Sequence, residues 1–200
     1  MKRTIGLLFV LLTLNTITMG QKKELKGFEL IREGEKINVS AEKLWEIIGP
    51  GFGDAYVWAT TVDHSTTSGK AEFEGATCSA RSCDLSASGF DKIEEKITKY
   101  NVQDRSFAYD VTEGLPGFVA SASNDWTVIS VGHNQSKLIM KADFRVQGFM
   151  GSIMKGMMEK KMDKLLAVVL NDLKVYAETG MPSESKQARI KELAKKNNAA

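Results

Sequence analysis

The segment GSIMKGMMEKKMDKLLAVVLNDLKVYAET, residues 151–179, decides the fold because it carries the longest regular hydrophobic period in the chain. Apolar residues recur there at spacings of three and four, as they do on one face of an α-helix. Gly180 and Pro182 end the segment. A helix of about seven turns can bury such a face only against a second layer of structure. The predicted apolar face comprises Met154, Met158, Met162, Leu165, Val169, Leu173 and Tyr176.

The residues before this helix predict the second layer. Between residues 61 and 147 no ten-residue stretch has a helical period, and alternating segments are separated by turn residues. Short connections between successive strands predict an antiparallel meander. The predicted strands span residues 61–67, 76–85, 91–100, 106–113, 120–131 and 135–147.

A first strand and two short helices precede the meander. The stretch FELIREGEKINVS, residues 28–40, predicts a strand that leads into Ser40, a good helix N-cap. The stretch AEKLWEII, residues 41–48, predicts a helix, and residues 52–60 predict a second helical segment. The fold class is therefore α+β, with seven strands and one long C-terminal helix.

The two ends of the chain differ from its middle. Residues 1–20 begin with Lys2 and Arg3, continue through an apolar stretch from Ile5 to Ile17, and have the outline of a secretory signal peptide. We therefore expect an exported protein, periplasmic or secreted, with an uncleaved anchor as the alternative. Residues 24–180 form the predicted domain. Residues 181–200 are polar and basic, and we expect a solvated tail, partly helical or disordered, with no assigned function.

The charge balance argues against nucleic acid as a partner. Without Lys2 and Arg3 the chain has 25 Lys and Arg against 25 Asp and Glu. Affinity for nucleic acid comes largely from clustered basic residues, and attraction to anionic membranes has the same origin. The sequence therefore predicts no nucleic-acid binding and disfavours binding to anionic membranes. No segment after the first is apolar enough to insert stably into a membrane.

The two cysteines, Cys78 and Cys83, lie in one predicted strand. A spacing of five residues places them on opposite faces, roughly 16 Å apart, so they should not form a disulfide without a bulge. We interpret them as small buried apolar residues, with a disulfide or a reactive thiol as alternatives. Two cysteines without nearby histidines predict no metal site.

The order of these elements and two stretches of sequence resemble a known superfamily. KINVSAEKLWEII, residues 36–48, resembles the opening of the SRPBCC group of polyketide cyclase/dehydrase and lipid-transport proteins. GATCSARSCDLSASGFDKIEEKITKYNVQDRSFAYDVTEG, residues 75–114, is similar to the core of that group. The resemblance covers residues 28–179. It implies the START-like helix-grip fold, in which a curved antiparallel sheet wraps around a long helix and encloses a cavity. It implies no particular reaction.

Register arithmetic predicts one polar pair on the cavity wall. If the turn between two meander strands centres on residues 87 and 88, Arg81 faces Glu95 and Cys83 faces Ile93. Ile93 and Ile97 flank Glu95 on the same face, so this face should point inward. The pair is either an ion pair that fixes strand register or a group that orients a ligand or moves a proton. The resembling family has Arg and Glu at equivalent places.

Strand alternation predicts the remaining cavity residues. The charged set Lys141, Asp143 and Arg145 fixes which side of the last strand points inward. The alternative to a pocket is that the inward side chains simply fill a core. The candidate ligand-binding residues are Trp58, Arg81, Glu95, Phe107, Tyr109, Trp126, Met140, Phe144, Met154, Met158 and Met162.

Few other residues indicate chemistry. Asp63 and His64 could transfer a proton if they faced the cavity, although a surface histidine is the more common outcome. Gly148, Gly151 and Gly156 predict either a loose gate at the start of the long helix or a plain turn. No cofactor motif and no heptad dimerisation seam is present.

These observations support three functions. The leading one is an exported carrier or binding protein for a small hydrophobic ligand, either a lipid or an aromatic, polyketide-like molecule. The second is a cyclase- or dehydratase-type enzyme, in which Arg81 polarises a carbonyl while Glu95 or Tyr109 moves a proton. The third is an interaction module with a filled core.

Overall fold

The structure, a computed structural model, describes residues 25–86 and 91–198. Its elements confirm the α+β class, and the signal peptide predicted for residues 1–20 lies outside the described part. In chain order the elements are β1 (Lys26–Glu33), α1 (Ala41–Ile48), the 3-10 helix η1 (Pro50–Asp54), α2 (Ala55–Trp58), β2 (His64–Ser68), β3 (Ala80–Asp84), β4 (Lys92–Asn101), β5 (Ser106–Glu113), β6 (Val119–Gly132), β7 (Gln135–Val146), α3 (Gly148–Thr179) and α4 (Glu184–Asn197).

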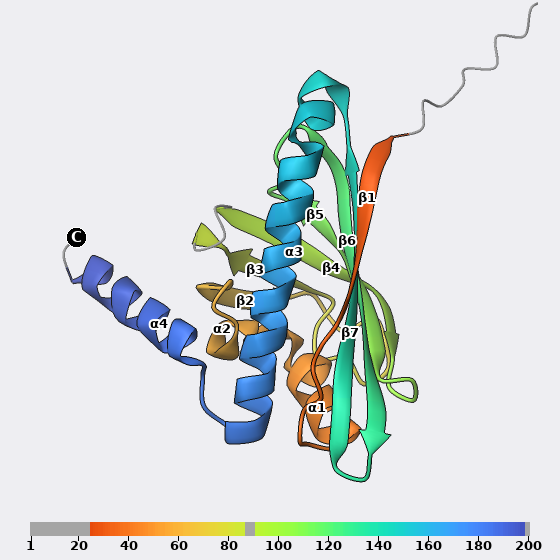
Figure 1. Cartoon of the computed structure of the whole chain (residues 1–200), viewed down its shortest axis with the longest axis vertical. Coiled ribbons are helices and arrows are strands. Elements are labelled where there is room, and N and C mark those ends of the chain that lie inside the picture. The colour runs from red at the N-terminus through yellow and green to blue at the C-terminus, as the bar shows by residue number, and fades with distance from the viewer. Residues whose placement is uncertain (1–24, 87–90, 199–200) are drawn as a thin grey trace, which may run out of the picture.

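The described strands form one antiparallel sheet in the order β1-β7-β6-β5-β4-β3-β2. Strands β2 to β7 follow the predicted meander, and β1 returns to pair with β7 through the register Phe28 opposite Phe144. Figure 1 shows the sheet curving around α3, with α1 and α2 beside the lower half of that helix. The helix-grip fold is therefore confirmed.

Helix α1 begins where the sequence predicts it. Ser40 has extended backbone angles, and its hydroxyl accepts a hydrogen bond from the Lys43 amide at 3.2 Å. Leu44, Trp45 and Ile48 are buried, as the hydrophobic spacing requires. The helix thereby packs against β6, β7 and α3 (Figure 1).

The predicted register between β3 and β4 is confirmed. Arg81 lies opposite Glu95, and Cys83 lies opposite Ile93. The turn itself falls in residues 87–90, outside the described part. The inward side of β7 is also as predicted, because Leu138, Met140, Ala142 and Phe144 are all buried.

Strand β3 is shorter than predicted, which changes the setting of the cysteines. Cys78 precedes the strand, in a loop whose Thr77 hydroxyl donates to the Pro50 carbonyl at 2.9 Å. The placement of both cysteines in one strand was therefore wrong. Both are nevertheless free and buried, in agreement with the interpretation as small apolar residues.

Helix α3 crosses the concave face of the sheet without interruption. Its buried residues are Gly151, Met158, Met162, Leu166, Asp172, Leu173 and Ala177. Gly151 lies so close to β7 and to the Phe118 carbonyl that an added Cβ would stand 3.0 Å from each. Tight packing accounts for that glycine, and a plain start to the helix fits the structure better than a loose gate.

The chain after α3 is more ordered than the sequence suggests. Residues 184–197 form α4, and the expectation of a solvated tail is wrong at Ser183 and Lys186, which are 5% and 1% exposed. The Lys186 ammonium donates to the Val62 carbonyl at 2.7 Å, and Arg189 forms two hydrogen bonds of 2.7 Å with Asp63. Sequence periodicity did not reveal this because the partners lie more than 120 residues away.

Candidate functional site

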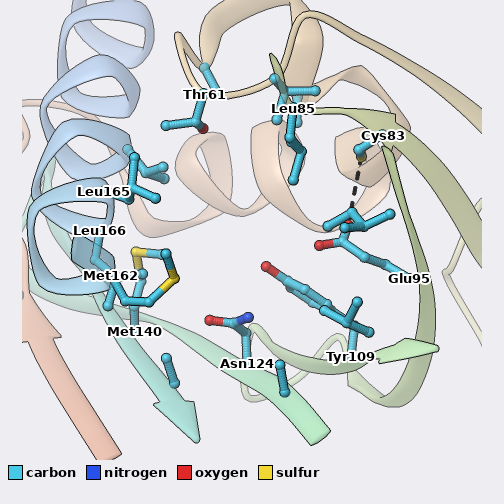
Figure 2. A pocket seen from close by; sticks show the side chains of 18 of the residues that line it. Thr61, Cys83, Leu85, Glu95, Tyr109, Asn124, Met140, Met162, Leu165 and Leu166 are labelled. Carbon is cyan, nitrogen blue, oxygen red and sulfur yellow. Dashed lines mark hydrogen bonds between the residues drawn. The ribbon is translucent and has the colours of Figure 1, made fainter. Parts of the chain in front are cut away.

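A cavity of about 150 Å³ lies between α3 and the sheet. Its walls come from α2, strands β3 to β7, the middle of α3 and the loops at residues 59–62, 85 and 115. Most of the lining is apolar, with sulfur from Met140 and Met162 (Figure 2). Its presence favours a pocket over a completely filled core.

The structure brings eight of the predicted ligand-binding residues to this cavity and leaves three away from it. The eight are Trp58, Arg81, Glu95, Tyr109, Trp126, Met140, Phe144 and Met162. Phe107 is 1% exposed and packs against the rings of Trp45, Phe52 and Trp126 in the adjoining core. Met154 and Met158 do not line the cavity. They lie nearer the start of α3, whereas the lining residues of that helix fall between Met162 and Val169.

Sequence reasoning missed several lining residues. Asn124 could have been found, since it stands two residues from Trp126 in β6 and strand alternation places both on one side. Thr61, Leu85 and Leu115 lie at or beyond strand ends, where alternation gives no information. Leu165 was placed on the apolar face of the long helix but Leu166, the next residue, was not, and both line the cavity.

The Arg81–Glu95 pair forms a buried ion pair in the wall. The Arg81 Nε donates to Glu95 Oε2 at 2.5 Å, and the side chains are 7% and 6% exposed. A second guanidinium nitrogen donates to the Phe52 carbonyl at 2.5 Å, and the guanidinium carbon lies 3.9 Å from the centroid of the Phe52 ring. Burial alone would lower the pKa of Arg81, but the Glu95 carboxylate raises it, so the arginine stays charged.

Tyr109 and Asn124 place polar atoms inside the same cavity (Figure 2). Burial raises the pKa of the Tyr109 hydroxyl well above its usual value, and the nearby Glu95 carboxylate raises it further. The hydroxyl therefore stays protonated at neutral pH and can donate a hydrogen bond. The Asn124 amide can both donate and accept. One wall of an apolar cavity can thus recognise a polar substituent.

Cys83 lies next to the pair, with its sulfur 3.7 Å from Glu95 Oε2. Burial raises its pKa to about 12, and the Glu95 carboxylate adds to that effect. Burial also raises the pKa of Cys78. Both thiols are therefore held in the protonated form, which is the unreactive one.

We expect both thiols to react with Ellman's reagent at pH 8 at least 100-fold more slowly in the folded protein than in urea. Cys83, with a pKa of about 12, is roughly 10⁻⁴ thiolate at that pH; burial also raises the pKa of Cys78 and excludes the reagent from both thiols. Absorbance at 412 nm measures the reaction. A fast phase that corresponds to one thiol per chain would contradict the buried setting.

The Asp63–His64 pair does not reach the cavity. His64 is exposed and has Tyr56 as its ring neighbour, with 5.6 Å between the ring centroids. Burial opposes the ionisation of Asp63, but hydrogen bonds from Arg189 and Ser86 lower its pKa overall. The carboxylate thus serves to hold α4, and the proton-transfer alternative for this pair was wrong.

Within the described residues no group of three or more His, Cys, Asp or Glu side chains could hold a metal ion. Among the helices described, none is both long and apolar enough to cross a membrane.

Comparison with known families identifies the class of protein. The family model described as "Polyketide cyclase / dehydrase and lipid transport" matches residues 31–178. The chain therefore belongs to this family, as the resemblance in its sequence implied. The comparison with curated proteins returned no match.

Solved structures with the same fold include enzymes and a protein named only by its superfamily. Norcoclaurine synthase from Thalictrum flavum has a TM-score of 0.60 at 13% identity, with 78% of this chain and 98% of that chain covered. The Zhui aromatase/cyclase from a Streptomyces strain has a TM-score of 0.59 at 11% identity, with 79% and 100% covered. A START superfamily protein from Mycobacterium smegmatis has a TM-score of 0.52 at 15% identity, with 72% and 98% covered. At these identities the likeness establishes the fold alone.

Proposed function

We propose that the protein is an exported binding or carrier protein for a small hydrophobic molecule, held in the cavity between α3 and the sheet. The observation that carries the proposal is the cavity of about 150 Å³ with its largely apolar lining. Apolar pockets with a few convergent polar groups are the usual form of small-molecule sites. The signal-like sequence of residues 1–20 supports export.

The volume of the cavity indicates the size of the ligand. A dry apolar cavity of about 150 Å³ in another protein holds benzene. A ring-sized molecule therefore fits here without rearrangement, whereas a fatty acyl chain is several times larger. An aromatic ligand is thus favoured over a lipid. Norcoclaurine synthase, which has the same fold, has been solved in complex with dopamine and hydroxybenzaldehyde, each of which contains a single aromatic ring.

The polar groups of the wall indicate that the ligand carries an oxygen. The Tyr109 hydroxyl and the Asn124 amide both offer a donor to the cavity. Trp58 and Trp126 also line it, and their indole nitrogens are buried without a hydrogen-bond partner among the described residues. An unpaired buried N–H costs about 1–3 kcal/mol. A carbonyl or phenol oxygen on the ligand would satisfy such a donor.

Filling the cavity should weaken ligand binding. We expect Val169→Phe to weaken the binding of benzaldehyde at least tenfold, because the new ring occupies the cavity that Val169 lines. Val168→Phe is the matched control, since Val168 is 37% exposed, projects about 100° away from Val169 on the same helix and does not line the cavity. Titration calorimetry measures both. Equal affinity in the two variants would contradict binding in the cavity.

Native mass spectrometry of protein from its own source tests the proposal without a chosen ligand. A co-purifying small molecule supports a carrier, and the mass of the polypeptide shows whether residues 1–20 have been removed. Protein free of any guest, both as isolated and after incubation with ring compounds, would contradict the proposal.

The same wall supports one second candidate, a cyclase- or dehydratase-type enzyme. The favouring observation is that Glu95 and Tyr109 reach the cavity together (Figure 2). Against it, the Arg81 guanidinium already donates to Glu95 and to the Phe52 carbonyl, so less of it is free to polarise a substrate. Loss of turnover in Tyr109→Phe with unchanged ligand affinity would favour the enzyme over the carrier.

A further inference from the structure

The first turns of α3 expose large apolar side chains on the side away from the sheet. Phe149 is 79% exposed, Met150 55%, Ile153 58% and Met157 59%. Soluble proteins tolerate single exposed apolar residues, whereas a contiguous group marks an interaction surface. These four side chains fall within three turns of one helix.

Helical geometry places the four on one face. At about 100° per residue, Phe149, Met150, Ile153 and Met157 fall within an arc of roughly 100°. Met158 and Met162, which are buried against the sheet, project to the opposite side. The exposed group is therefore separate from the core and from the cavity.

Lysines continue the same face along the helix. Lys160 and Lys164 are exposed and fall in the same arc, and the exposed Lys161 lies about 20° beyond its edge, so apolar residues at the start of the helix are followed by a basic stretch. We call these seven residues the outer face of α3. The two acidic residues of this stretch, Glu159 and Asp163, project beside that face, and Asp163 pairs there with Arg32 of β1.

The outer face lies at the end of the domain where the chain enters it. Lys26, the first residue of β1, pairs with Val146, two residues before α3 begins, and Figure 1 shows both elements starting at the same end. Residues 1–24, whose sequence is apolar from Ile5 to Ile17, precede β1 and therefore attach to this end of the domain. If that apolar segment is a signal peptide, it brings this end of the domain to a membrane before cleavage.

We propose that the outer face of α3 docks on the surface of a membrane that contains anionic lipid. Large apolar side chains next to lysines are the composition of helices that lie in the membrane interface. The apolar residues enter the headgroup region, and the lysines contact lipid phosphates. The neutral overall charge predicts no attraction of the chain as a whole to anionic membranes, but electrostatic attraction acts within a Debye length of about 10 Å, so the local lysines of the outer face decide it.

Vesicle co-sedimentation of the chain from Gln21 to Ala200, which contains every described helix and strand, tests the proposal. We expect binding to vesicles of equal parts phosphatidylglycerol and phosphatidylcholine at 50 mM salt, and at least tenfold weaker binding to phosphatidylcholine alone. Phe149→Ser with Ile153→Ser should weaken binding at least tenfold. Lys160→Glu with Lys164→Glu should do the same, since each lysine near an anionic surface contributes about fivefold.

Two matched controls use exposed residues elsewhere. Ile31→Ser replaces an apolar side chain that is 66% exposed on the other side of the sheet, and Lys99→Glu reverses a charge on β4 that is 70% exposed. Both should bind as the unaltered chain does. Circular dichroism checks that every variant is folded.

Absence of binding to the mixed vesicles would overturn the proposal, as would unchanged binding by both double variants. Analytical ultracentrifugation tests whether a second copy of the chain, rather than a membrane, covers the outer face. A dimer that dissociates in the Phe149→Ser, Ile153→Ser variant would show that a second copy covers the outer face, and would also overturn the proposal. The outcome is independent of the cavity, which the substitutions do not touch.

Discussion

Replacing Glu95 with Gln lowers the free energy of unfolding by about 3–5 kcal/mol. The substitution removes the carboxylate that partners Arg81 at 2.5 Å, and both side chains are more than nine-tenths buried. Breaking a buried ion pair by removing one partner leaves an uncompensated charge, which accounts for a loss of that size. Urea denaturation followed by circular dichroism measures it.

Glu94→Gln is the matched control, because Glu94 is the adjacent residue and its pair with Lys92, at 3.8 Å, is long and partly exposed to solvent. We expect a change below about 0.5 kcal/mol there. Arg81→Met combined with Glu95→Leu should recover most of the stability lost by Glu95→Gln, because no charge is then left buried. A loss below about 1 kcal/mol for Glu95→Gln alone would contradict the buried setting of the pair.

Replacing Asp172 with Ala should destabilise the protein by about 3 kcal/mol. The Asp172 carboxylate is fully buried on α3 and accepts hydrogen bonds from the Thr60 amide at 2.7 Å and the Ser183 hydroxyl at 2.5 Å. Its loss leaves the Thr60 amide unpaired and withdraws a negative charge from the buried Lys186 ammonium. Both the loop at residue 60 and the start of α4 should loosen.

Asp163→Ala provides the comparison on the same helix. Asp163 pairs with Arg32 at a site where both side chains are more than one-third exposed, so its loss should lower the denaturant midpoint far less than the loss of Asp172 does. Denaturant midpoints of the two variants give the difference directly, and hydrogen exchange locates the loosened segments. Equal effects would mean that α4 is held by something other than the Asp172 network.

Most of the fold could be predicted from the sequence, because its signals are local. The period of three and four residues identifies α3, and alternation identifies the inward side of β7. The pairing of Arg81 with Glu95 could be predicted from the position of a single turn. Once the turn between β3 and β4 is placed, antiparallel pairing determines which residues of the two strands face each other. Strand ends were less predictable, as the position of Cys78 before β3 shows.

The site was predicted less completely, because a cavity depends on distances between elements. Periodicity shows that Met154, Met158 and Met162 lie toward the sheet, but only the tertiary structure shows that the void begins near Met162. The contact between α4 and residues 60–63 could not be predicted either, because it also depends on how separate elements pack together. Its partners Asp172 and Lys186 are polar residues in separate elements, and no local pattern marks polar residues as buried.

Methionine methyl NMR tests most directly whether the cavity binds a ring-sized guest. In a chain labelled with ¹³C at the methionine methyls, titration with benzaldehyde should shift the signals of Met140 and Met162, which line the cavity. The exposed Met150 and Met181 serve as internal controls and should not move. Saturable shifts confined to Met140 and Met162 are the predicted result. Unchanged Met140 and Met162 signals at millimolar benzaldehyde, or shifts only at the exposed methionines, would contradict the account.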